Sequence, residues 1–460
     1  MTIHTRLIAL FLSLLIVLQG CGGGTLADGG MSGSGISTGS VTGFGSIFVN
    51  GVEFQTTAAQ INVNGQVFSN VDDTTLQTIL NKGMVVTVRG TIDPGGATGI
   101  ANVVTYARIL QGPISGTPGA SSFIAMGQTV IVDSQTVFDG YGVTGLGDLN
   151  DADVVEVSGF VDPAGNIRAT FIEKTTSLTH EITGQVTAIG TNQFNIGDLV
   201  VNWTGSTVTV SSFVAVKGQM NGSGQLDATS VNSIDPGFGI EDADDAELEG
   251  LAQTACLPDA ANPPCEFTLG AQTVRVSAGT EIKGGVIADI QPGVRLEVEG
   301  SLVNGTMIAD KVDFEAGIEL EAGVDSVTED PVAGTKTLTL TGLAGTSVIL
   351  DSASTNFDGP TYSGINDTVY LKIRGRALGN QVTATRVESG SRPDVRLRAP
   401  VQNFDPNVSL TVLGITIDTV TNNLVGPQFY ANLQVGDTVG AEGILNNSGE
   451  VDWQSVQLEE

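Results

Sequence analysis

The sequence predicts an all-β fold, a tandem array of about six small five-stranded OB-like β-barrels that follows an N-terminal leader and a flexible linker. Three observations support it. A strand ending in glycine recurs six times, roughly 60 to 80 residues apart. Within each copy apolar residues alternate with polar ones, which is the period of a half-buried strand. The chain has 61 glycines and only 5% aromatic residues, and no long helical periodicity follows the leader.

The recurring strand is defined by a glycine at its end and by two apolar positions before it. The six copies read VVTVRG, VVEVSG, FVAVKG, RLEVEG, YLKIRG and TVGAEG, and they end at Gly90, Gly159, Gly218, Gly300, Gly375 and Gly443. The residues two and four places before each glycine are all apolar, and the residue immediately before it is always polar. One face of this strand therefore lies in a core and the other faces water.

Further strands flank the recurring one in each copy. A turn and a second strand follow the glycine, and together they predict a hairpin. Each copy opens with an apolar residue and, two places later, a small one: Val41/Gly43, Ile114/Gly116, Ile182/Gly184, Leu248/Gly250, Leu320/Ala322 and Leu397/Ala399. A further strand comes next, as in TVIVD, TVRVS, SVILD and GITID. The small residue is expected where the opening strand bends to close a barrel.

A short helix or turn separates the third and fourth strands of each copy. In the first copy Asp72 or Asp73 is a suitable helix cap, Leu76 and Leu80 share one face, and Gly83 is suited to end the helix. Five strands with a helix between the third and fourth is the order of the OB-like barrel. A flat sandwich that spans two copies is the competing arrangement.

The repeats set the expected domain boundaries. We expect a signal peptide at residues 1–20, a lipidated cysteine with a Gly/Ser linker at 21–38, and repeats at 39–110, 111–177, 178–240, 241–316, 317–391 and 392–460. The fourth repeat begins with an acidic linker, and the array is expected to bend there, at residues 235–247, and again at 389–396.

The first 21 residues predict export and lipid anchoring. Arg6 precedes a mostly apolar run that is too short to span a bilayer comfortably, and LQGC follows it. LQGC resembles the lipobox of bacterial lipoproteins, which implies that Leu18, Gln19 and Gly20 form the cleavage motif and that Cys21 carries acyl chains such as palmitate. Gly22 after the cysteine resembles sorting to the outer membrane, facing the periplasm or the cell surface. The acyl chains would make the membrane a partner.

Charge and cysteine content restrict the remaining chemistry. The net charge of −31 disfavours nucleic acid as a partner. Cys256 and Cys265 are the thiols left after Cys21, and an oxidising periplasm favours a disulfide between them; a pair of metal-binding thiolates is the alternative. We expect no cofactor, apart from Ca²⁺ at an oxygen-rich loop that contains Asp148, Asn150, Asp151 and Asp153.

No catalytic constellation is evident in the sequence. His180 is the one histidine that follows the signal peptide, and we interpret it as a solvated residue at a strand end. Asp139 and Asp358 occupy matching places in TVFDG and TNFDG, where a turn is the favoured interpretation over a carboxylate site. The stretch TGFGSIFVNGVEF, from Thr42 to Phe54, lacks the third glycine of a dinucleotide-binding loop and predicts a hairpin instead.

The motifs resemble a known family. TGFGSI, GMVVTVRGTID, DVVEVSGFVD and the leader are similar to exported bacterial proteins that carry tandem copies of domain of unknown function 5666, most closely in the first and second repeats. The resemblance implies small β-barrels and an exported location. The hypothesis is therefore a lipid-anchored, non-catalytic cell-envelope spacer, scaffold or binding array, with an envelope protein or glycan as partner. A glycan- or Ca²⁺-binding surface module and a carboxylate-dependent hydrolase are the alternatives.

Overall fold

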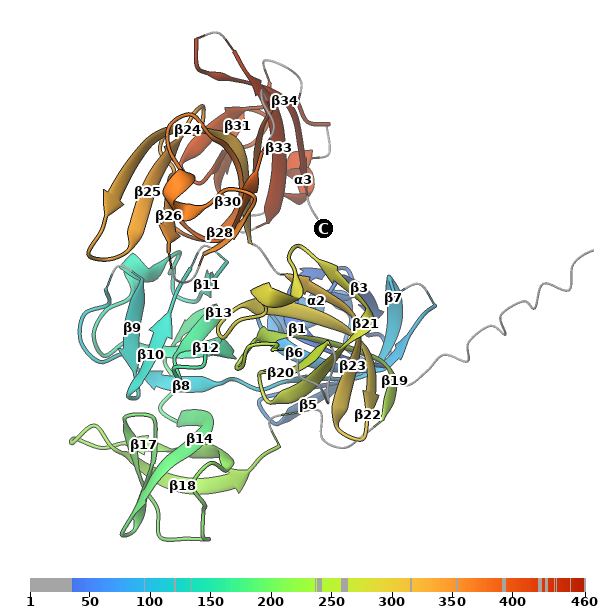
Figure 1. The fold of residues 1–460 in the computed structure, drawn as a ribbon. Helices are drawn as coiled ribbons and strands as arrows, with labels where there is room; N and C mark the ends of the chain where they lie inside the picture. The colour runs from blue at the N-terminus through green and yellow to red at the C-terminus, as the bar shows by residue number, and fades with distance from the viewer. Residues whose placement is uncertain are drawn as a thin grey trace, which may run out of the picture.

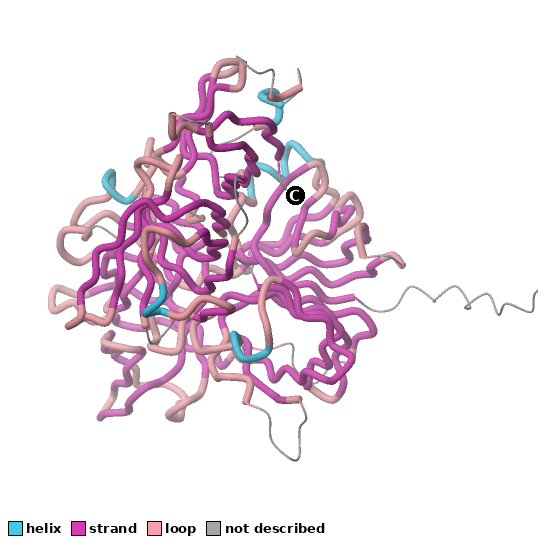
Figure 2. The backbone as a smooth tube through the Cα atoms, turned by 45° about the horizontal axis from the view of Figure 1, so that its top comes forward, coloured by secondary structure: helices cyan, strands magenta, loops and turns pink. Residues whose placement is uncertain are grey.

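The computed structural model is built almost entirely of β-strands (Figures 1 and 2). It describes residues 35–458 except 95, 120, 134, 236, 238–241, 258–263, 315–316, 353–354, 391–393, 421–423, 427–428, 434, 436 and 447. Within these residues no helix has the length and apolar character needed to cross a membrane. The strands fall into six units, numbered here in chain order.

The first three units contain the following elements. Unit 1 consists of β1 (Gly35–Phe44), β2 (Ile47–Val49), β3 (Val52–Gln55), β4 (Gln60–Val63), β5 (Gln66–Ser69), α2 (Asp73–Ile79), β6 (Val85–Ile92) and β7 (Thr98–Tyr106). Unit 2 consists of β8 (Leu110–Pro113), β9 (Ser122–Ala125), β10 (Gln128–Ile131), β11 (Val137–Asp139), η1 (Leu146–Asp148), β12 (Val154–Val161) and β13 (Ile167–Thr175). Unit 3 consists of β14 (His180–Gly190), β15 (Gln193–Ile196), β16 (Leu199–Asn202), β17 (Phe213–Met220) and β18 (Leu226–Ser233).

The last three units follow the same order. Unit 4 consists of β19 (Ala243–Leu251), β20 (Cys265–Leu269), β21 (Gln272–Lys283), η2 (Ile287–Asp289), β22 (Arg295–Val303) and β23 (Thr306–Phe314). Unit 5 consists of β24 (Ile318–Asp330), β25 (Thr335–Leu340), β26 (Ser347–Asp351), β27 (Asn356–Asp358), η3 (Tyr362–Gly364), β28 (Tyr370–Leu378) and β29 (Gln381–Ser389). Unit 6 consists of β30 (Asp394–Asp405), β31 (Ser409–Val412), β32 (Ile415–Asp418), α3 (Phe429–Asn432), β33 (Thr438–Leu445) and β34 (Val451–Leu458).

The units close into small barrels with the OB-like strand order. In unit 3, β14 pairs with β15, β15 with β16, β16 in parallel with β18, β18 with β17, and β17 again with β14. Units 1 and 5 close the same ring, and single bridges at Ile114–Ala125 and Ala252–Leu269 complete it in units 2 and 4. In unit 6, β30 pairs with β31 and β33, β31 with β32, and β33 with β34, but no pairing of β32 with β34 is present among the described residues. The predicted barrels are confirmed, with the ring closed in units 1 to 5, and the flat sandwich is wrong.

The glycine that marks each repeat lies at a β-bulge. The register between the fourth and fifth strands shifts at this glycine in all six units. In units 1 to 5 a Cβ on it would lie only 1.9 to 2.3 Å from a carbonyl oxygen of the opposite strand, such as Arg168 O for Gly159. Backbone approach this close leaves no room for a side chain. The repeat therefore keeps glycine for steric reasons.

The structure corrects the opening pair of residues in units 1 and 2. On the first strand of each unit, a small residue pairs with the fourth-strand residue that lies four places before the repeat glycine. This small residue is Gly184 in unit 3 and Gly250 in unit 4, as predicted, but it is Gly39 in unit 1 and Gly112 in unit 2. These lie four residues before the expected Gly43 and Gly116. A Cβ on Gly39 or Gly112 would collide with Asn50 or Met126 across the barrel. Packing against a large neighbour therefore explains the small residue, rather than a bend.

This register moves two boundaries. β1 begins at Gly35, inside the segment 21–38 that was predicted to be linker, and Ile36 is buried. β8 begins at Leu110, before the expected start of the second repeat at residue 111. The predicted acidic linker at residues 235–247 is also too long, because β19 begins at Ala243 and Glu247 is buried. The boundaries of β1, β8 and β19 are set by pairing with distant strands, and the local amino-acid composition does not reveal this pairing.

The barrels associate in pairs through their first strands. The second strand of a barrel covers only the later half of the first strand, which leaves one edge of the earlier half open. β1 pairs in parallel with β19, β8 antiparallel with β14, and β24 antiparallel with β30. Units 1 and 4, 2 and 3, and 5 and 6 are thus joined (Figure 1). Pairing of two open edges removes both from solvent.

Polar side chains form ladders across these joints. In units 5 and 6 directly opposed residues alternate in charge along the row Glu388, Lys372, Glu321, Arg396 and Glu442. In units 1 and 4 the row instead places Glu299 opposite Glu247 and Glu247 beside Ser37. Burial raises the pKa of Glu247 to about 8 and the nearby Glu299 charge adds to the shift, although a hydrogen bond from Ser37 opposes it. Glu247 is therefore neutral at pH 7.

Candidate functional site

A cleft of about 360 Å³ lies where units 1, 2 and 3 meet. Unit 1 contributes the β4–β5 hairpin and the end of β7, unit 2 contributes Ser158 of β12, and unit 3 contributes β14 and β17. The segment between β7 and β8 crosses the cleft and brings Arg108 into it. The site is thus built between barrels rather than on the face of one barrel.

A polar ladder forms one side of this joint. Lys217, Glu181, Gln111, Glu156 and Glu173 oppose one another in turn on five successive strands, β17, β14, β8, β12 and β13. The row holds three carboxylates and one cation. Burial raises the pKa of Glu173, and the charges of Glu156 and Asp139 raise it further.

Arg108 supplies the positive charge that this row lacks. Its Nη1 lies 3.0 Å from Glu156 Oε2 and also contacts Gln111 Oε1. The hydroxyl of Tyr106 donates to Glu156 Oε1 at 2.7 Å. Burial and the Glu156 charge together raise the pKa of Tyr106 well above its usual value, so the phenol remains protonated. These contacts connect the end of unit 1 to the centre of the unit 2–3 joint.

Glu181 lies between two cations inside the cleft. Its Oε1 is 3.3 Å from Lys217 Nζ and its Oε2 is 3.9 Å from Arg108 Nε. Both contacts are ion pairs without hydrogen-bond geometry, and among the described residues they are the only polar side-chain contacts of the Glu181 carboxylate. Only 14% of its side chain is exposed. The carboxylate is therefore balanced in charge while its hydrogen-bonding capacity is unused.

The hairpin of unit 1 places two amides at the rim. Asn64 and Gly65 both have positive φ, 53° and 89°, as a tight two-residue turn requires. Asn62 Oδ1 accepts from Gly65 N at 3.0 Å, and Asn64 Oδ1 accepts from Arg108 N at 2.9 Å. Both oxygens are therefore used within the protein. Among described residues neither Nδ2 forms a hydrogen bond, so two donors remain for a ligand or water.

His180 is placed at the start of β14, as predicted, but it is not simply solvated. Its Nδ1 accepts from Met220 N at 2.9 Å. Burial lowers its pKa, so the ring is neutral at pH 7 and serves as a backbone acceptor. The side chain holds the end of β17 against β14.

The candidate Ca²⁺ loop is connected by its own hydrogen bonds. Asp148 accepts from Thr144 N and Oγ1, Asp151 accepts from Gly116 N at 2.6 Å, and Asp153 accepts from Asn150 N and from Lys174 Nζ. The hydrogen bonds from Thr144 lower the pKa of Asp148. In the described part of the chain no three His, Cys, Asp or Glu residues are grouped to hold a metal ion. Ca²⁺ binding here stays a prediction.

The remaining motifs have structural roles. Asp139 and Asp358 each precede a glycine with positive φ, Gly140 and Gly359, which is a turn conformation. Asp358 also pairs with Arg386. The stretch TGFGSIFVNGVEF forms the end of β1, then β2, and turns at Asn50-Gly51 into β3, which confirms the predicted hairpin.

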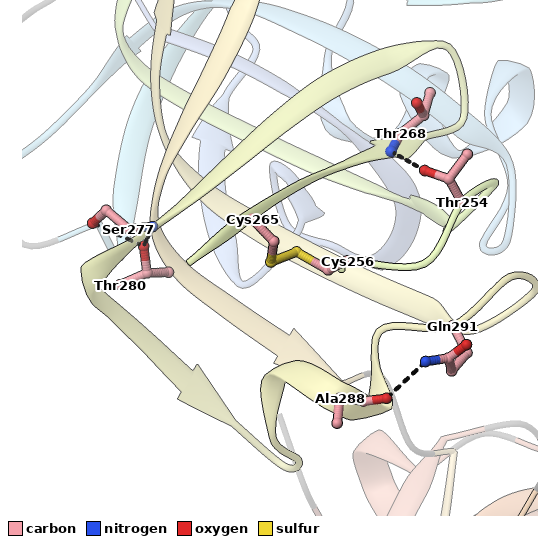
Figure 3. The surroundings of a disulfide bond; sticks show 8 residues. All are labelled: Thr254, Cys256, Cys265, Thr268, Ser277, Thr280, Ala288 and Gln291. Carbon is pink, nitrogen blue, oxygen red and sulfur yellow. Dashed lines mark hydrogen bonds between the residues drawn. A yellow bond between two sulfur atoms is a disulfide. The ribbon is translucent and has the colours of Figure 1, made fainter. Parts of the chain in front are cut away.

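Cys256 and Cys265 form a disulfide, with their Cα atoms 5.4 Å apart (Figure 3). Both cysteines are buried in the core of unit 4. Beside the bond, Thr268 N donates to Thr254 Oγ1 at 2.9 Å. The disulfide thus anchors the connection between β19 and β20. Leu18, Gln19, Gly20 and Cys21 lie outside the described residues, so the lipidation motif stays a prediction.

Comparison with known families concerns the middle of the chain. The family model described as domain of unknown function (DUF5666) matches residues 111–173, 183–232 and 259–313. Three tandem segments of the chain thus match this family model. They correspond to units 2, 3 and 4. The motifs favour the first and second repeats as the closest to the family; the matched segments include the second repeat and do not include the first. Of the residues in the cleft, Lys217 and Ser158 lie within the matched segments, whereas Glu181 lies just before one.

Two further comparisons add no function. No curated protein matches the chain. Among solved structures, the chain described as Drosophila Unr CSD456 is 14% identical, with 45% of this chain and 97% of that chain covered and a TM-score of 0.12. The assignment of OB-like barrels therefore rests on the strand pairing described above.

Proposed function

We propose that the protein is a lipid-anchored, non-catalytic scaffold of the cell envelope. The observation that carries the proposal is the pairing of first strands, which joins six barrels into three two-barrel blocks. Such blocks suit a rigid platform better than an extended spacer. The leader motif ending in Cys21 supports placement at the outer membrane, facing the periplasm or the surface.

Ion pairs and hydrogen bonds between blocks support the same proposal. Arg386 of unit 5 bonds to Asp289 of unit 4 at 2.5 Å, and Lys82 of unit 1 bonds to Asp437 of unit 6 at 2.9 Å. Arg295 of unit 4 reaches Gln135 of unit 2 at 3.2 Å. Because these contacts connect all three blocks, the protein is expected to behave as one body in solution.

Small-angle X-ray scattering tests the rigid scaffold. For a soluble chain that starts at Gly22, we expect a radius of gyration of about 22 Å, the value for a compact protein of this length. A flexible string of six separate barrels would give a clearly larger value, because its units would not pack against one another. A radius in the larger range would refute the scaffold and favour a spacer.

Metabolic labelling tests the anchor separately. In a Gram-negative bacterial host supplied with radiolabelled palmitate, we expect label in the full-length protein and none in Cys21→Ala. The wild type should sediment with outer membranes and be released by detergent. Equal labelling of Cys21→Ala would contradict lipidation at this residue while leaving the scaffold intact.

A further inference from the structure

We infer that the cleft between units 1, 2 and 3 binds a neutral saccharide. The inference goes beyond the scaffold, since a rigid array needs no ligand. The volume of about 360 Å³ lies at the lower end of the range for small-molecule sites, roughly 300 to 1,000 Å³. Because residues of three units line it, the cleft is complete only when these units are assembled.

The hydrogen-bonding groups of the cleft match hydroxyls. The two carboxylate oxygens of Glu181 meet Lys217 Nζ at 3.3 Å and Arg108 Nε at 3.9 Å as ion pairs without hydrogen-bond geometry, so they can still accept hydrogen bonds. A hydroxyl donates and accepts at the same time. One hydroxyl, or two on neighbouring carbons, can therefore donate to Glu181 and accept from Lys217. Both hydrogen bonds would be charge-assisted, which makes them stronger than neutral ones.

Charge balance favours a neutral ligand. Arg108 and Lys217 carry two positive charges, and their partners Glu156 and Glu181 carry two negative charges. An anion would meet Glu181 as well as Lys217, and a cation would meet Arg108. Neither gains a net attraction, and the net charge of −31 opposes anions further.

The remaining walls suit a sugar ring. Asn62 and Asn64 present Nδ2 groups that are not used within the described structure, and these can donate to ring or hydroxyl oxygens. Val85, Ile109 and Ile234 line other parts of the cleft. Sugars combine hydroxyl edges with apolar C–H faces, so the mixture of polar and apolar walls fits this class.

Saturation-transfer NMR on the soluble chain from Gly22 tests the inference. The probes are glucose, galactose, mannose, N-acetylglucosamine and maltose, with glucuronate as the anionic comparison. We expect signal transfer to at least one neutral sugar, with a signal at least fivefold weaker in Glu181→Gln and in Lys217→Met. Glu281→Gln is the matched control, because Glu281 lies on unit 4 with 62% of its side chain exposed; its signal should equal that of the wild type.

Each outcome of this experiment supports or overturns the saccharide site. Absence of transfer to every neutral sugar would overturn the inference, as would transfer to glucuronate alone. Transfer that persists in both cleft variants would place sugar binding elsewhere and equally overturn it. Melting temperatures of the variants close to that of the wild type would show that any lost signal does not reflect unfolding. A compact scattering radius with no sugar signal would reject the ligand and leave the scaffold standing.

Discussion

The repeat glycines allow two neighbouring strands of each barrel to approach more closely than any side chain would permit. At Gly218 of unit 3 an added Cβ would lie 2.3 Å from Asp227 O, whereas at Gly222 nothing lies within 4 Å. Both glycines have φ outside the left-handed region, so the two positions differ in space and not in backbone strain.

Replacement of Gly218 should therefore be costly. We expect Gly218→Ala to lower the free energy of unfolding of unit 3 by about 1 to 3 kcal/mol, as overpacked sites do. Gly222→Ala should change it by less than about 0.5 kcal/mol. Hydrogen exchange of the β17 and β18 amides measures both. Equal protection in the two variants would contradict the steric role of the glycine.

Glu247 gives the unit 1–4 joint a defined pH dependence. Its pKa is raised from 4.5 to about 8 in the folded protein. The folded state therefore holds a proton that the unfolded state releases, and its contribution to stability is complete below pH 4.5. It is lost as the pH rises to about 8, at up to about 1.4 kcal/mol per pH unit.

A neutral replacement removes this dependence. Relative to the wild type, we expect the melting temperature of Glu247→Gln to increase progressively between pH 5 and pH 8, as the wild type loses stability. Differential scanning calorimetry at three pH values measures the difference. Glu281→Gln, at an exposed site, should show a constant offset. A constant offset for Glu247→Gln as well would show that Glu247 does not titrate in this range.

At the scale of elements, a threonine that is buried in units 2 and 5 and partly buried in unit 4 holds the interrupted third strand of the barrel. Thr136, Thr280 and Thr355 donate to the carbonyl oxygens of Ala169, Ala309 and Ala384 on the fifth strand, at 2.7 to 2.9 Å. Each threonine hydroxyl also accepts a backbone N–H from the third strand or the turn after it. Where the third strand is interrupted, the threonine hydroxyl thus takes the place of the backbone hydrogen bonds that would otherwise join it to the fifth strand.

Loss of this hydroxyl should weaken the strand pair. We expect Thr355→Val, which keeps the shape, to cost about 1 to 3 kcal/mol because it leaves a buried N–H and a buried carbonyl without a partner. Thr385→Val is the control, since the Thr385 hydroxyl is exposed. Urea denaturation of both variants measures the difference. Similar midpoints for the two would show that the hydroxyl contributes nothing at this position.

Local and nonlocal elements were not equally predictable. The helix α2 was predicted because its signals are adjacent: Asp72 caps it through Thr75 N at 2.7 Å, and Leu76 and Leu80 are buried. The opening strand of unit 1 is misplaced in the sequence-based prediction because Val41/Gly43 fits the apolar–small pattern and Ser37/Gly39 does not, although pairing with β6 puts Gly39 at that position. The cleft was missed because Arg108, Glu181 and Lys217 come from separate elements joined by register.

At the scale of the whole molecule, Arg386 connects units 4 and 5. It is 6% exposed and bonds to Asp289, Asp358 and Glu388. Asp289 is also buried, so removal of the guanidinium leaves a buried carboxylate without its cation. Such a change typically costs about 3 to 5 kcal/mol.

Arg386→Met should therefore loosen the contact between the two units. We expect faster hydrogen exchange in η2 and β29 than in the wild type, with unit 3 unchanged. Arg275→Met breaks the exposed pair with Glu266 and should cost less than about 1 kcal/mol. Unchanged exchange at η2 in Arg386→Met would show that the ion pair does not couple the units.

The pairing of β1 with β19 also sets the order in which the protein can mature. Gly35 is matched with Asp245, so the open edge of β1 waits for a strand that is synthesised only after two entire barrels have followed the first one. Until then β1 presents an uncovered edge, which is the kind of surface that aggregates. Contacts so distant in the chain form slowly. Protection of this edge until β19 is available would therefore determine how much protein reaches its final state.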